Sequence, residues 1–587
     1  MSSSIAISYA AKRSAFDSVA IVSIKGLYLF ACLLFLLQQA SASADITADV
    51  FGDVVDVLPL AFGDFNSDKL TDVIVLRNHY SFEVMLASIK APYLQLSGIA
   101  CSFSLPISSV VPGDFDGDAA MDLLVVTNSS AGTNVYIAWG KLDGVICPHF
   151  KLFEVDAEPL VVDFNSDMIS DIVGYKDGKI KVWIWGTNRT VEEEIIMDTS
   201  ELRIPHSSAF VDLNRDLAAD IVITGKNELS LWYYEDSRYE KKTIIRYPEV
   251  ALVGQLILTD LNSSGKIDII FPVCVDKACR NSTFMIYQND SWINIETEMT
   301  DKMVQMTFAQ PKSSVLYRDT LTGRVGDFNL DGYPDVLITV DSGLATKVAL
   351  LENTACDVCF YRRKLVLRWL SDMDNTVMGT FYDIQENGIL DIITVGYKSG
   401  RLEVAAFRND GFDANFIKVI VLTGRCYSNC THGNLPYGTN LPGPTIIYKT
   451  TRYDGGSQIS CASQLSQSAH LVMQLPYTVF GLGRTPNFIE HLEVGLTYPD
   501  PGRRRREWTQ IIPNSQMMII PNLIGQPRYW LNKLFVTPSN AIVLSACALA
   551  GFGGLLAIFI LVLQCREKKL DKQERLKEAH KFHFDAM

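Results

Sequence analysis

The sequence predicts an all-β protein with three parts: a seven-bladed β-propeller, a small β-rich module and a single transmembrane helix. Three observations support this fold class. An acidic loop recurs seven times along the chain. Successive copies start 50, 49, 49, 48, 67 and 56 residues apart, close to the length of a four-stranded propeller blade. An unbroken apolar stretch of 23 residues, from Ala541 to Leu563, lies near the C-terminus.

The first expected element is a signal peptide over residues 1–44. Lys25 precedes an apolar run from Leu27 to Leu37, and "ASASA" then supplies small residues for cleavage after Ala44. The alternative is an uncleaved signal anchor. An apolar run this short spans a bilayer poorly, which favours the signal peptide.

Residues 45–425 contain the repeats and are expected to form the propeller. A short apolar run such as "DVIVL" or "DLLVV" follows the acidic loops, and a turn with an alternating strand comes next, as in "KDGKIKVWIWG". Alternation of this kind, bounded by turn residues, is typical of β-hairpins. Each repeat therefore predicts one antiparallel sheet.

The loop "DFNLDGYPDV", residues 327–336, has the residue types of a calcium site. Side-chain oxygens fall at Asp327, Asn329 and Asp331, Gly332 permits a sharp turn, and Asp335 closes the loop. Calcium takes six to eight oxygen ligands, and carboxylates at alternate loop positions can converge on one ion. A strand-like segment follows instead of the helix of an EF-hand. The alternative interpretation is a metal-free, Asx-rich turn.

The repeats also carry a family resemblance. "VPGDFDGDAAMDLLVV" and "RVGDFNLDGYPDVLIT" resemble the FG-GAP repeat of integrin α-chain propellers, although the Gly-Ala-Pro element is missing after the loops. The whole arrangement, across nearly the full chain, is similar to the T-cell immunomodulatory protein (Linkin) family. That resemblance implies a role in cell adhesion or in modulation of T-cell function.

The resemblance also implies which side chains bind calcium: those at loop positions one, three, five and nine. In five loops these residues are Asp64, Asn66, Asp68 and Asp72; Asp114, Asp116, Asp118 and Asp122; Asp163, Asn165, Asp167 and Asp171; Asp212, Asn214, Asp216 and Asp220; and Asp327, Asn329, Asp331 and Asp335. The loop from Asp260, with Asn262 and Asp268, has Ser264 at position five, and the loop from Asp383 has Gln385 and Asn387. These two loops carry less charge, so weaker binding is expected and their occupancy stays open.

We expect the calcium to act as a structural staple and not as a switch. Calcium sites in extracellular modules typically have dissociation constants of about 10⁻⁴–10⁻³ M. Bound ions then stabilise the folded state by mass action. The formal net charge of −14 adds self-repulsion to the compact state. Removal of calcium is therefore expected to loosen the propeller.

Cysteine usage and glycosylation sequons fit an oxidising, extracellular compartment. Of 12 cysteines, Cys32, Cys547 and Cys565 lie outside the expected ectodomain, which leaves an odd number there. Candidate disulfides are Cys101–Cys147, Cys274–Cys279, the "CDVC" pair Cys356–Cys359, and two among Cys426, Cys430 and Cys461. Candidate N-glycosylation sites are Asn128, Asn188, Asn281, Asn289 and Asn429.

Residues 426–538 are expected to form a second β-rich unit. Part of it, "FGLGRTPNFIEHLEVGLTYPDPGRRRREWTQII", resembles the β module that follows related propellers in the cartilage acidic protein group. The run from Arg503 to Arg506 stands out in an acidic ectodomain. We interpret it as a solvated hairpin tip, with a processing site or a polyanion contact as alternatives.

Residues 539–564 are expected to cross the membrane, with a short cytosolic tail over residues 565–587. The apolar stretch measures about 35 Å as a helix, which is long enough to span the hydrocarbon core. Arg566, Lys568 and Lys569 follow it, so the positive-inside rule predicts a single-pass type I protein with a cytosolic C-terminus and the propeller outside the cell or in a secretory lumen. The expected location is the plasma membrane, reached through the secretory pathway. Small residues recur at Ala546, Ala550 and Gly554, which would suit a weak helix dimer.

These features together predict a binding protein and not an enzyme. The sequence contains no G-x-S-x-G elbow, H-E-x-x-H helix or P-loop. The net negative charge disfavours nucleic-acid binding. The expected function is a calcium-stabilised scaffold that recognises an extracellular or cell-surface protein. The alternatives are a secretory-pathway protein that assists folding or assembly of other membrane proteins and, third, a glycan- or lipid-directed hydrolase with a pocket built from several blades.

Overall fold

The computed structural model describes residues 44–584 except 130–131, 142–143, 198–200, 313–317, 411–413, 427–429, 431–436, 453–454, 470–472, 485–486 and 538–539. The expected signal peptide thus lies almost wholly outside the described residues. The described chain is built from β-strands, with one short helix, α2 (Thr47–Phe51), and one long C-terminal helix. This confirms the all-β class with a single apolar helix.

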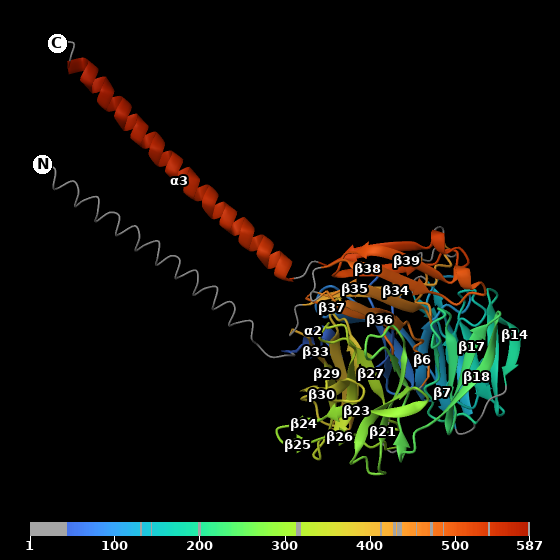
Figure 1. Ribbon diagram of the computed structural model, residues 1–587. Helices are drawn as coiled ribbons and strands as arrows, with labels where there is room; N and C mark the ends of the chain where they lie inside the picture. The colour runs from blue at the N-terminus through green and yellow to red at the C-terminus, as the bar shows by residue number, and fades with distance from the viewer. Residues whose placement is uncertain are drawn as a thin grey trace.

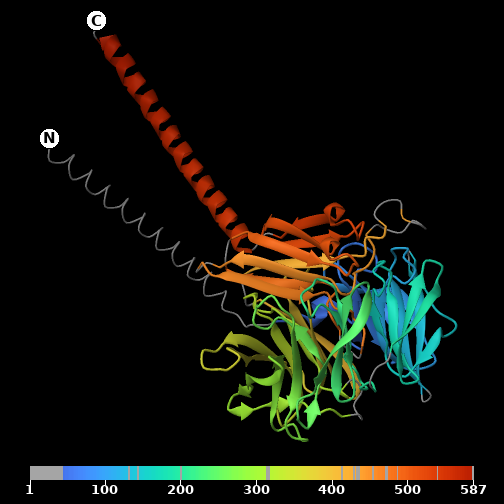
Figure 2. The same ribbon diagram turned by 45° about the vertical axis from the view of Figure 1, so that its right-hand side comes forward.

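Small antiparallel sheets follow one another along the chain (Figures 1 and 2), and we number them sheets 1 to 7. Sheets 1 to 4 are β2 (Leu58–Gly63), β3 (Asp72–Arg77), β4 (Ser81–Ala87) and β5 (Leu94–Ser102); β6 (Ile107–Gly113), β7 (Asp122–Ser129), β8 (Gly132–Lys141) and β10 (Phe153–Val155), with β9 (Gly144–Ile146) beside β8; β11 (Leu160–Val162), β12 (Asp171–Lys176), β13 (Lys179–Gly186) and β14 (Thr190–Met197); and β15 (Ala209–Val211), β16 (Asp220–Thr224), β17 (Glu228–Glu235) and β18 (Arg238–Arg246).

Sheets 5 and 6 are joined, because their outer strands β23 and β30 pair in parallel and make one ten-stranded sheet. Sheet 5 contains β19 (Leu252–Val253), β20 (Ile257–Thr259), β21 (Asp268–Cys274), β22 (Ser282–Gln288) and β23 (Ser291–Glu298), and sheet 6 contains β26 (Thr307–Phe308), β27 (Gly323–Gly326), β28 (Asp335–Asp341), β29 (Thr346–Ala355) and β30 (Arg363–Leu370). A small hairpin of β24 (Thr300–Asp301) and β25 (Val304–Gln305) lies between them in sequence.

Sheet 7 is completed by the N-terminal end of the described chain. It contains β31 (Thr376–Tyr382), β32 (Asp391–Lys398) and β33 (Arg401–Arg408), and β1 (Ala44–Asp45) pairs with β33 as its fourth strand. Residues from opposite ends of the repeat region therefore share one sheet. That pairing ties the first repeat to the last.

Turn chemistry sets the strand register locally. Between β12 and β13 the chain reverses through Asp177 (φ 54°) and Gly178 (φ 75°), so both central residues are left-handed. This is the geometry of a type I′ hairpin turn, which the Asp-Gly dipeptide favours. Lys176 and Lys179 then face each other as a register pair.

The hydrophobic core is divided into clusters that each join neighbouring sheets. Sheets 2 and 3 share Phe115 with Trp183 and Trp185, for example, and corresponding clusters join sheets 3 and 4, 4 and 5, 5 and 6, and 6 and 7. A further cluster joins sheet 7 to sheets 1 and 2, where the rings of Phe62 and Tyr382 stack 5.3 Å apart. Packing thus passes from sheet to sheet and returns to the first.

The C-terminal β module consists of two further four-stranded sheets. They contain β34 (Asn415–Val421), β37 (Thr478–Gly483), β40 (Ser515–Ile520) and β41 (Leu531–Val536); and β35 (Thr445–Thr451), β36 (Ser457–Ser463), β38 (Ile489–Gly495) and β39 (Arg505–Ile511). The 3₁₀ turn η2 (Pro501–Arg503) lies between β38 and β39, and η3 (Pro527–Tyr529) lies between β40 and β41, so each joins two strands of one sheet. Because β34 pairs with β37 and β40, the module's first strand precedes the expected boundary at residue 425. In both views the module lies as a layer across one side of the numbered sheets (Figures 1 and 2).

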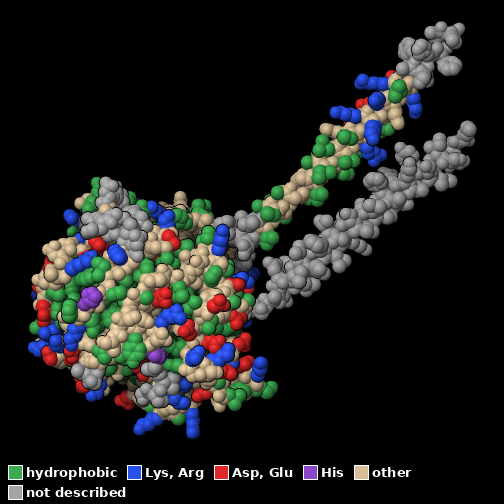
Figure 3. Space-filling model, turned by 180° about the vertical axis from the view of Figure 1, so that it is seen from behind, with side chains coloured by type: hydrophobic (Ala, Val, Ile, Leu, Met, Phe, Trp, Pro, Cys, Tyr) green, Lys and Arg blue, Asp and Glu red, His purple; other side chains and the backbone are tan. Residues whose placement is uncertain are grey.

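The long helix α3 (Asn540–Phe584) leaves the body from the module side (Figure 1). Among the described residues it is the one helix long and apolar enough to cross a membrane. Its body-proximal half carries apolar side chains, and Lys and Arg side chains gather toward its far end (Figure 3). The helix continues through most of the expected tail, residues 565–587, as one unbroken element.

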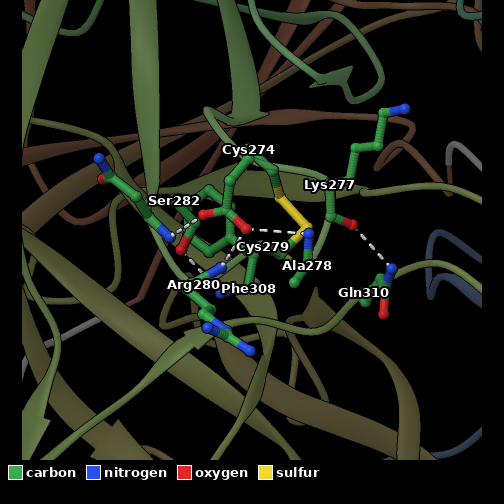
Figure 4. The surroundings of a disulfide bond; sticks show 10 residues. Cys274, Lys277, Ala278, Cys279, Arg280, Ser282, Phe308 and Gln310 are labelled. Atoms are coloured by element: carbon green, nitrogen blue, oxygen red, sulfur yellow. Dashed lines mark hydrogen bonds between the residues drawn. A yellow bond between two sulfur atoms is a disulfide. The ribbon is translucent and has the colours of Figure 1, made fainter.

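The described part of the chain contains four disulfides, and they confirm pairs expected from the sequence. They are Cys101–Cys147, Cys274–Cys279, Cys356–Cys359 and Cys426–Cys430, which leaves Cys461 as a buried free thiol. The Cys274–Cys279 bond closes a tight turn after β21 (Figure 4). Beside this turn Phe308 packs in the same cluster as both cysteines, and its amide donates to Ser282 Oγ at 2.9 Å.

Candidate functional site: the acidic loops beneath the β module

The seven acidic loops occupy equivalent positions in the seven sheets. Each connects a strand to its antiparallel neighbour, which begins at the last aspartate of the loop, for instance β2 to β3 and β27 to β28. We number them loops 1 to 7, starting at Asp64, Asp114, Asp163, Asp212, Asp260, Asp327 and Asp383. The structure therefore brings the predicted ligands of each loop together within that loop.

The first and last aspartates of each loop organise its backbone. In loop 6, Asp327 accepts the amides of Asp331 and Gly332 at 3.0 and 2.8 Å, and Asp335 accepts those of Phe328 and Asn353 at 3.1 and 2.8 Å. The position-one pattern recurs in all seven loops, with the accepted amides at positions four or five and six. These hydrogen bonds fix the loop to its sheet independently of any bound ion.

Burial makes these carboxylates costly to ionise without a cation. In loop 1, burial together with the charges of neighbouring aspartates raises the pKa of Asp64 to about 7 and that of Asp72 to about 8, although backbone amides oppose the shift. Burial likewise raises the pKa of Asp171 in loop 3 to about 7 and that of Asp391 in loop 7 to about 8. A bound cation would remove this cost by pairing with the ionised groups.

The donor sets fit a hard divalent cation. In loop 2 a carboxylate oxygen from each of Asp114, Asp116 and Asp122 lies within 4.8 Å of the others. Oxygens bound to one calcium at 2.3–2.6 Å must lie within about 5 Å of one another, so this spacing is compatible with a shared ion. In loop 5, Asn262 Oδ1 is buried and accepts no hydrogen bond within the described residues. A buried oxygen without a donor is also what a cation ligand requires.

A second cluster of candidate ligands, Glu296 with Cys356 and Cys359, does not fit a metal. Both sulfurs belong to one disulfide, so neither is a thiolate ligand.

The β module covers the acidic loops. The amide of Gly481 donates to Asp327 at 2.8 Å, and the amide of Cys461 donates to Asp260 at 3.1 Å. In loop 1 the Lys69 ammonium lies over the Phe535 ring, and in loop 2 Gly117 lies against the Arg425 guanidinium. In loop 3 the Asp167 carbonyl accepts a hydrogen bond from Arg425, and in loop 4 the Ala219 amide donates to the Thr497 hydroxyl. In loop 7 the Asp383 amide donates to the Tyr477 hydroxyl. Every acidic loop therefore contacts the module or the segment that follows β34.

Loop 7 contains a lysine from the module. Lys418 Nζ lies 2.9 Å from Asp383 Oδ2 and pairs with Glu386, and the Lys418 side chain is 1% exposed. The ammonium also lies 3.9 Å from the centre of the Tyr477 ring. Burial alone would lower the pKa of Lys418, but the charges of Asp383 and Glu386 outweigh it and hold that pKa above its ordinary value.

Arginines contact two further loops. Arg189 Nε pairs with Asp116 in loop 2 at 2.7 Å, and Arg504 Nη1 pairs with Asp216 in loop 4 at 2.9 Å. Among the described residues, no lysine or arginine forms an ion pair with a carboxylate of loops 1, 3 or 6. The loops thus differ in whether a lysine or arginine already pairs with one of their carboxylates.

The basic run at residues 503–506 is not simply a solvated hairpin tip. Arg504 is buried and points into loop 4, and Arg506 donates to the carbonyls of Pro527 and Arg528. Arg503 remains exposed and pairs with Asp500. The expectation failed because the residue that meets Arg504 lies nearly 300 positions earlier in the chain.

The glycosylation sequons fall on the surface where they are described. Asn128, Asn188, Asn281 and Asn289 are exposed, and Asn429 lies outside the described residues. The sequence interpretation missed Lys418 and Arg189 as loop partners. A signal for Lys418 was available, since loop 7 alone carries a glutamate, Glu386, at position four, and Asn387 stands where five of the other loops have an aspartate at position five.

The chain is similar to curated proteins along nearly its whole length. It is 37% identical to the human T-cell immunomodulatory protein over 583 residues, which covers 93% of this chain and 95% of the human protein. The chain belongs to the T-cell immunomodulatory protein family. Protein linkin of Caenorhabditis elegans is 28% identical over 618 residues, covering 94% of this chain and 99% of linkin. The family predicted from the sequence is thereby confirmed.

A family model and a solved structure are also similar to parts of this chain. The model described as "ITFG1, C2 domain" matches residues 436–535 of this member of the T-cell immunomodulatory protein family, which lie within the β module. The crystal structure of BBS1N in complex with ARL6DN is 12% identical, with a TM-score of 0.36 over 63% of this chain and 99% of the other. That similarity is too low to bear on function.

Proposed function

We propose that this protein is a single-pass type I membrane glycoprotein whose extracellular part is a calcium-stabilised, seven-bladed propeller capped by a C2-like module. It acts as a recognition scaffold in cell adhesion or in modulation of T-cell function. The names of its relatives support the immunomodulatory role, and the single apolar helix supports membrane insertion. The proposed partner is an extracellular or cell-surface protein.

Two features support the propeller. Seven sheets share one strand order and one loop position, and the hydrophobic clusters pass from each sheet to the next and back to the first. The pairing of β1 with β33 closes the seventh blade with an N-terminal strand, which removes an open edge. The β23–β30 pairing is then a link between the outer strands of blades 5 and 6.

Loops 1, 3 and 6 are the proposed principal calcium sites. In loop 1 the ion would be held by Asp64, Asn66, Asp68 and Asp72, and the equivalent positions serve in loops 3 and 6. Calcium supplies the positive charge that buried carboxylates need in order to ionise without repulsion. Loops 2 and 4 bind more weakly, because Arg189 and Arg504 pair with one of their carboxylates and compete with the ion.

The observation that carries the scaffold role is the coverage of the acidic loops by the module. Hydrogen bonds such as Gly481 to Asp327 and Cys461 to Asp260 join the two units into one body. The loop side is therefore unavailable to a large ligand. We assign partner recognition to the outer strands and to the side opposite the module.

The orientation follows from charge and redox chemistry. Basic residues cluster toward the far end of α3 (Figure 3), and the positive-inside rule supports a cytosolic position for that end. Four disulfides fit an oxidising compartment for the remainder of the chain. We propose no catalytic activity. A weak dimer through Ala546, Ala550 and Gly554 stays a prediction.

Surface labelling separates the proposal from its main alternative, a secretory-pathway protein that assists assembly of other membrane proteins. Intact cells that express the full chain are treated with a membrane-impermeant biotin reagent, with a cytosolic protein as the negative control. The proposal expects biotin on the body and none on the lysines beyond residue 565. Persistent absence of label on intact cells, with labelling restored after permeabilisation, would favour the internal role.

A further inference from the structure

We propose that Lys418 is the resident cation of loop 7: its ammonium takes the place that a calcium ion has in the other loops, so loop 7 binds no metal and anchors the β module directly. This inference rests on the proposed calcium role of the acidic loops and assigns the occupant of one of them. On this assignment the module docks on loop 7 through Lys418 and not through a bound calcium ion.

The geometry places the ammonium where a loop cation is needed. Lys418 Nζ contacts both acidic groups on its side of the loop, Asp383 at 2.9 Å and Glu386. The Asp383 and Lys418 side chains are 0% and 1% exposed, so neither charge is neutralised by solvent. The Tyr477 ring closes another side at 3.9 Å, where its face attracts the ammonium. The ammonium therefore supplies positive charge to the buried carboxylates of loop 7.

The loop sequence has changed to suit a single positive charge. The side chains at positions three and five are the neutral amides Gln385 and Asn387, while Glu386 adds a carboxylate at position four. A divalent ion prefers several carboxylates at the alternate positions, and loop 7 lacks the aspartate that five of the other loops carry at position five. Glu386 instead lies where it meets the incoming lysine. The neutral Asn387 at position five and the added Glu386 at position four therefore both favour a lysine as the cation of this loop.

The lysine also explains how the module is attached. Lys418 lies on β34, which pairs with β37 on one side and β40 on the other, so it is held in the middle of a module sheet. Glu386 accepts the amide of Thr71 in loop 1 at 2.8 Å as well as the lysine. One buried cation therefore connects the module, loop 7 and loop 1, across the junction where the last repeat meets the first.

Calcium counting tests the absence of metal in loop 7. The full chain, purified in detergent, is dialysed to equilibrium against calcium, and the bound ions per chain are counted for the parent, Asp68→Asn in loop 1 and Asp383→Asn in loop 7. We expect Asp68→Asn to lose one calcium and Asp383→Asn to keep the parental number. Loss of one calcium in Asp383→Asn would overturn the assignment.

Melting experiments keep the test decisive if Asp383→Asn does not fold. Lys418→Met is expected to lower the melting temperature by roughly 5–15 °C, equally in calcium and in chelator, because it strands buried carboxylates. The triple variant Lys418→Met, Asp383→Asn, Glu386→Gln, which we call the neutral triad, carries no buried charge at these three positions. It is expected to recover at least half of the lost melting temperature. Lys449→Met, which alters an exposed lysine on β35, is the matched control and should melt like the parent.

The outcomes distinguish this inference from the wider calcium proposal. If the parent binds no calcium at all, the staple fails, but the rescue by the neutral triad still establishes Lys418 as the loop cation. If Lys418→Met melts like the parent, or the neutral triad recovers nothing, the assignment of Lys418 is wrong whatever the calcium count.

Discussion

Removal of calcium should make the stability of this protein depend on pH in a defined direction. The perturbation is chelation of the full chain at pH 6 and at pH 8. Without a cation, the buried aspartates of loops 1 and 3 hold protons that the unfolded chain has already released, because burial raises their folded-state pKa values to about 7–8, well above the ordinary value of an aspartate. Their stabilising contribution is complete below about pH 4 and is lost as pH rises through 7–8.

The magnitude follows from the raised pKa values in loop 1. A group with a folded-state pKa of about 7, as for Asp64, loses roughly 1.4 kcal/mol of stability between pH 6 and pH 8. A group with a value of about 8, as for Asp72, loses roughly 2.3 kcal/mol over the same range. The two share one loop and influence each other, so their sum is an upper bound for that loop.

The assay is urea unfolding of the detergent-solubilised chain, followed by tryptophan fluorescence, in millimolar calcium and in chelator at both pH values. We expect the chelated protein to be less stable at pH 8 than at pH 6 by a few kcal/mol, and calcium to remove most of that difference because bound ions keep the carboxylates ionised at both pH values. Equal stability at the two pH values in chelator, or greater stability at pH 8, would refute the reasoning.

Three further predictions concern the module and the surface. Gly481→Ala should loosen the module and expose its junction to protease, since a Cβ there would lie 2.2 Å from the backbone of loop 6, whereas Gly502→Ala, which meets only an exposed side chain at 3.3 Å, should behave like the parent. Arg504→Gln should lower the free energy of unfolding in chelator by about 3 kcal/mol, because it breaks a buried ion pair, and should strengthen calcium binding at loop 4, because it removes a competing cation. The control Arg503→Gln, at an exposed ion pair, should cost under about 1 kcal/mol. Unchanged calcium affinity in Arg504→Gln would count against competition between the arginine and the ion. Asn188→Gln should reduce the mass of the cell-expressed protein by one glycan, and an unchanged mass would show that this sequon is unused.

Features encoded within a few residues were predictable from the sequence. The acidic loops, the apolar run after each of them and the 23-residue span depend on local spacing, and the structure places them as strands, loops and a helix. The Cys274–Cys279 disulfide was also predictable, because two cysteines five residues apart at a turn are close in any arrangement.

Features that depend on contacts between distant residues were not predictable. Lys418 looks like any strand lysine until β34 is placed between β37 and β40, and the strand itself lies before the boundary suggested by the end of the repeats. Arg504 appears in a run typical of a solvated tip, yet its side chain is buried and pairs with Asp216. The coverage of the loops by the module depends on such pairs, none of which leaves a periodic pattern in the sequence.

The most direct test of the central claim is a calorimetric calcium titration of the detergent-solubilised full chain, with its melting temperature recorded in calcium and in chelator. The account predicts saturable binding heat for at least three sites, from loops 1, 3 and 6, with dissociation constants of about 10⁻⁴–10⁻³ M and a higher melting temperature in calcium. No binding heat, together with identical melting in calcium and in chelator, would contradict it and would leave the acidic loops as metal-free turns held by their own amides.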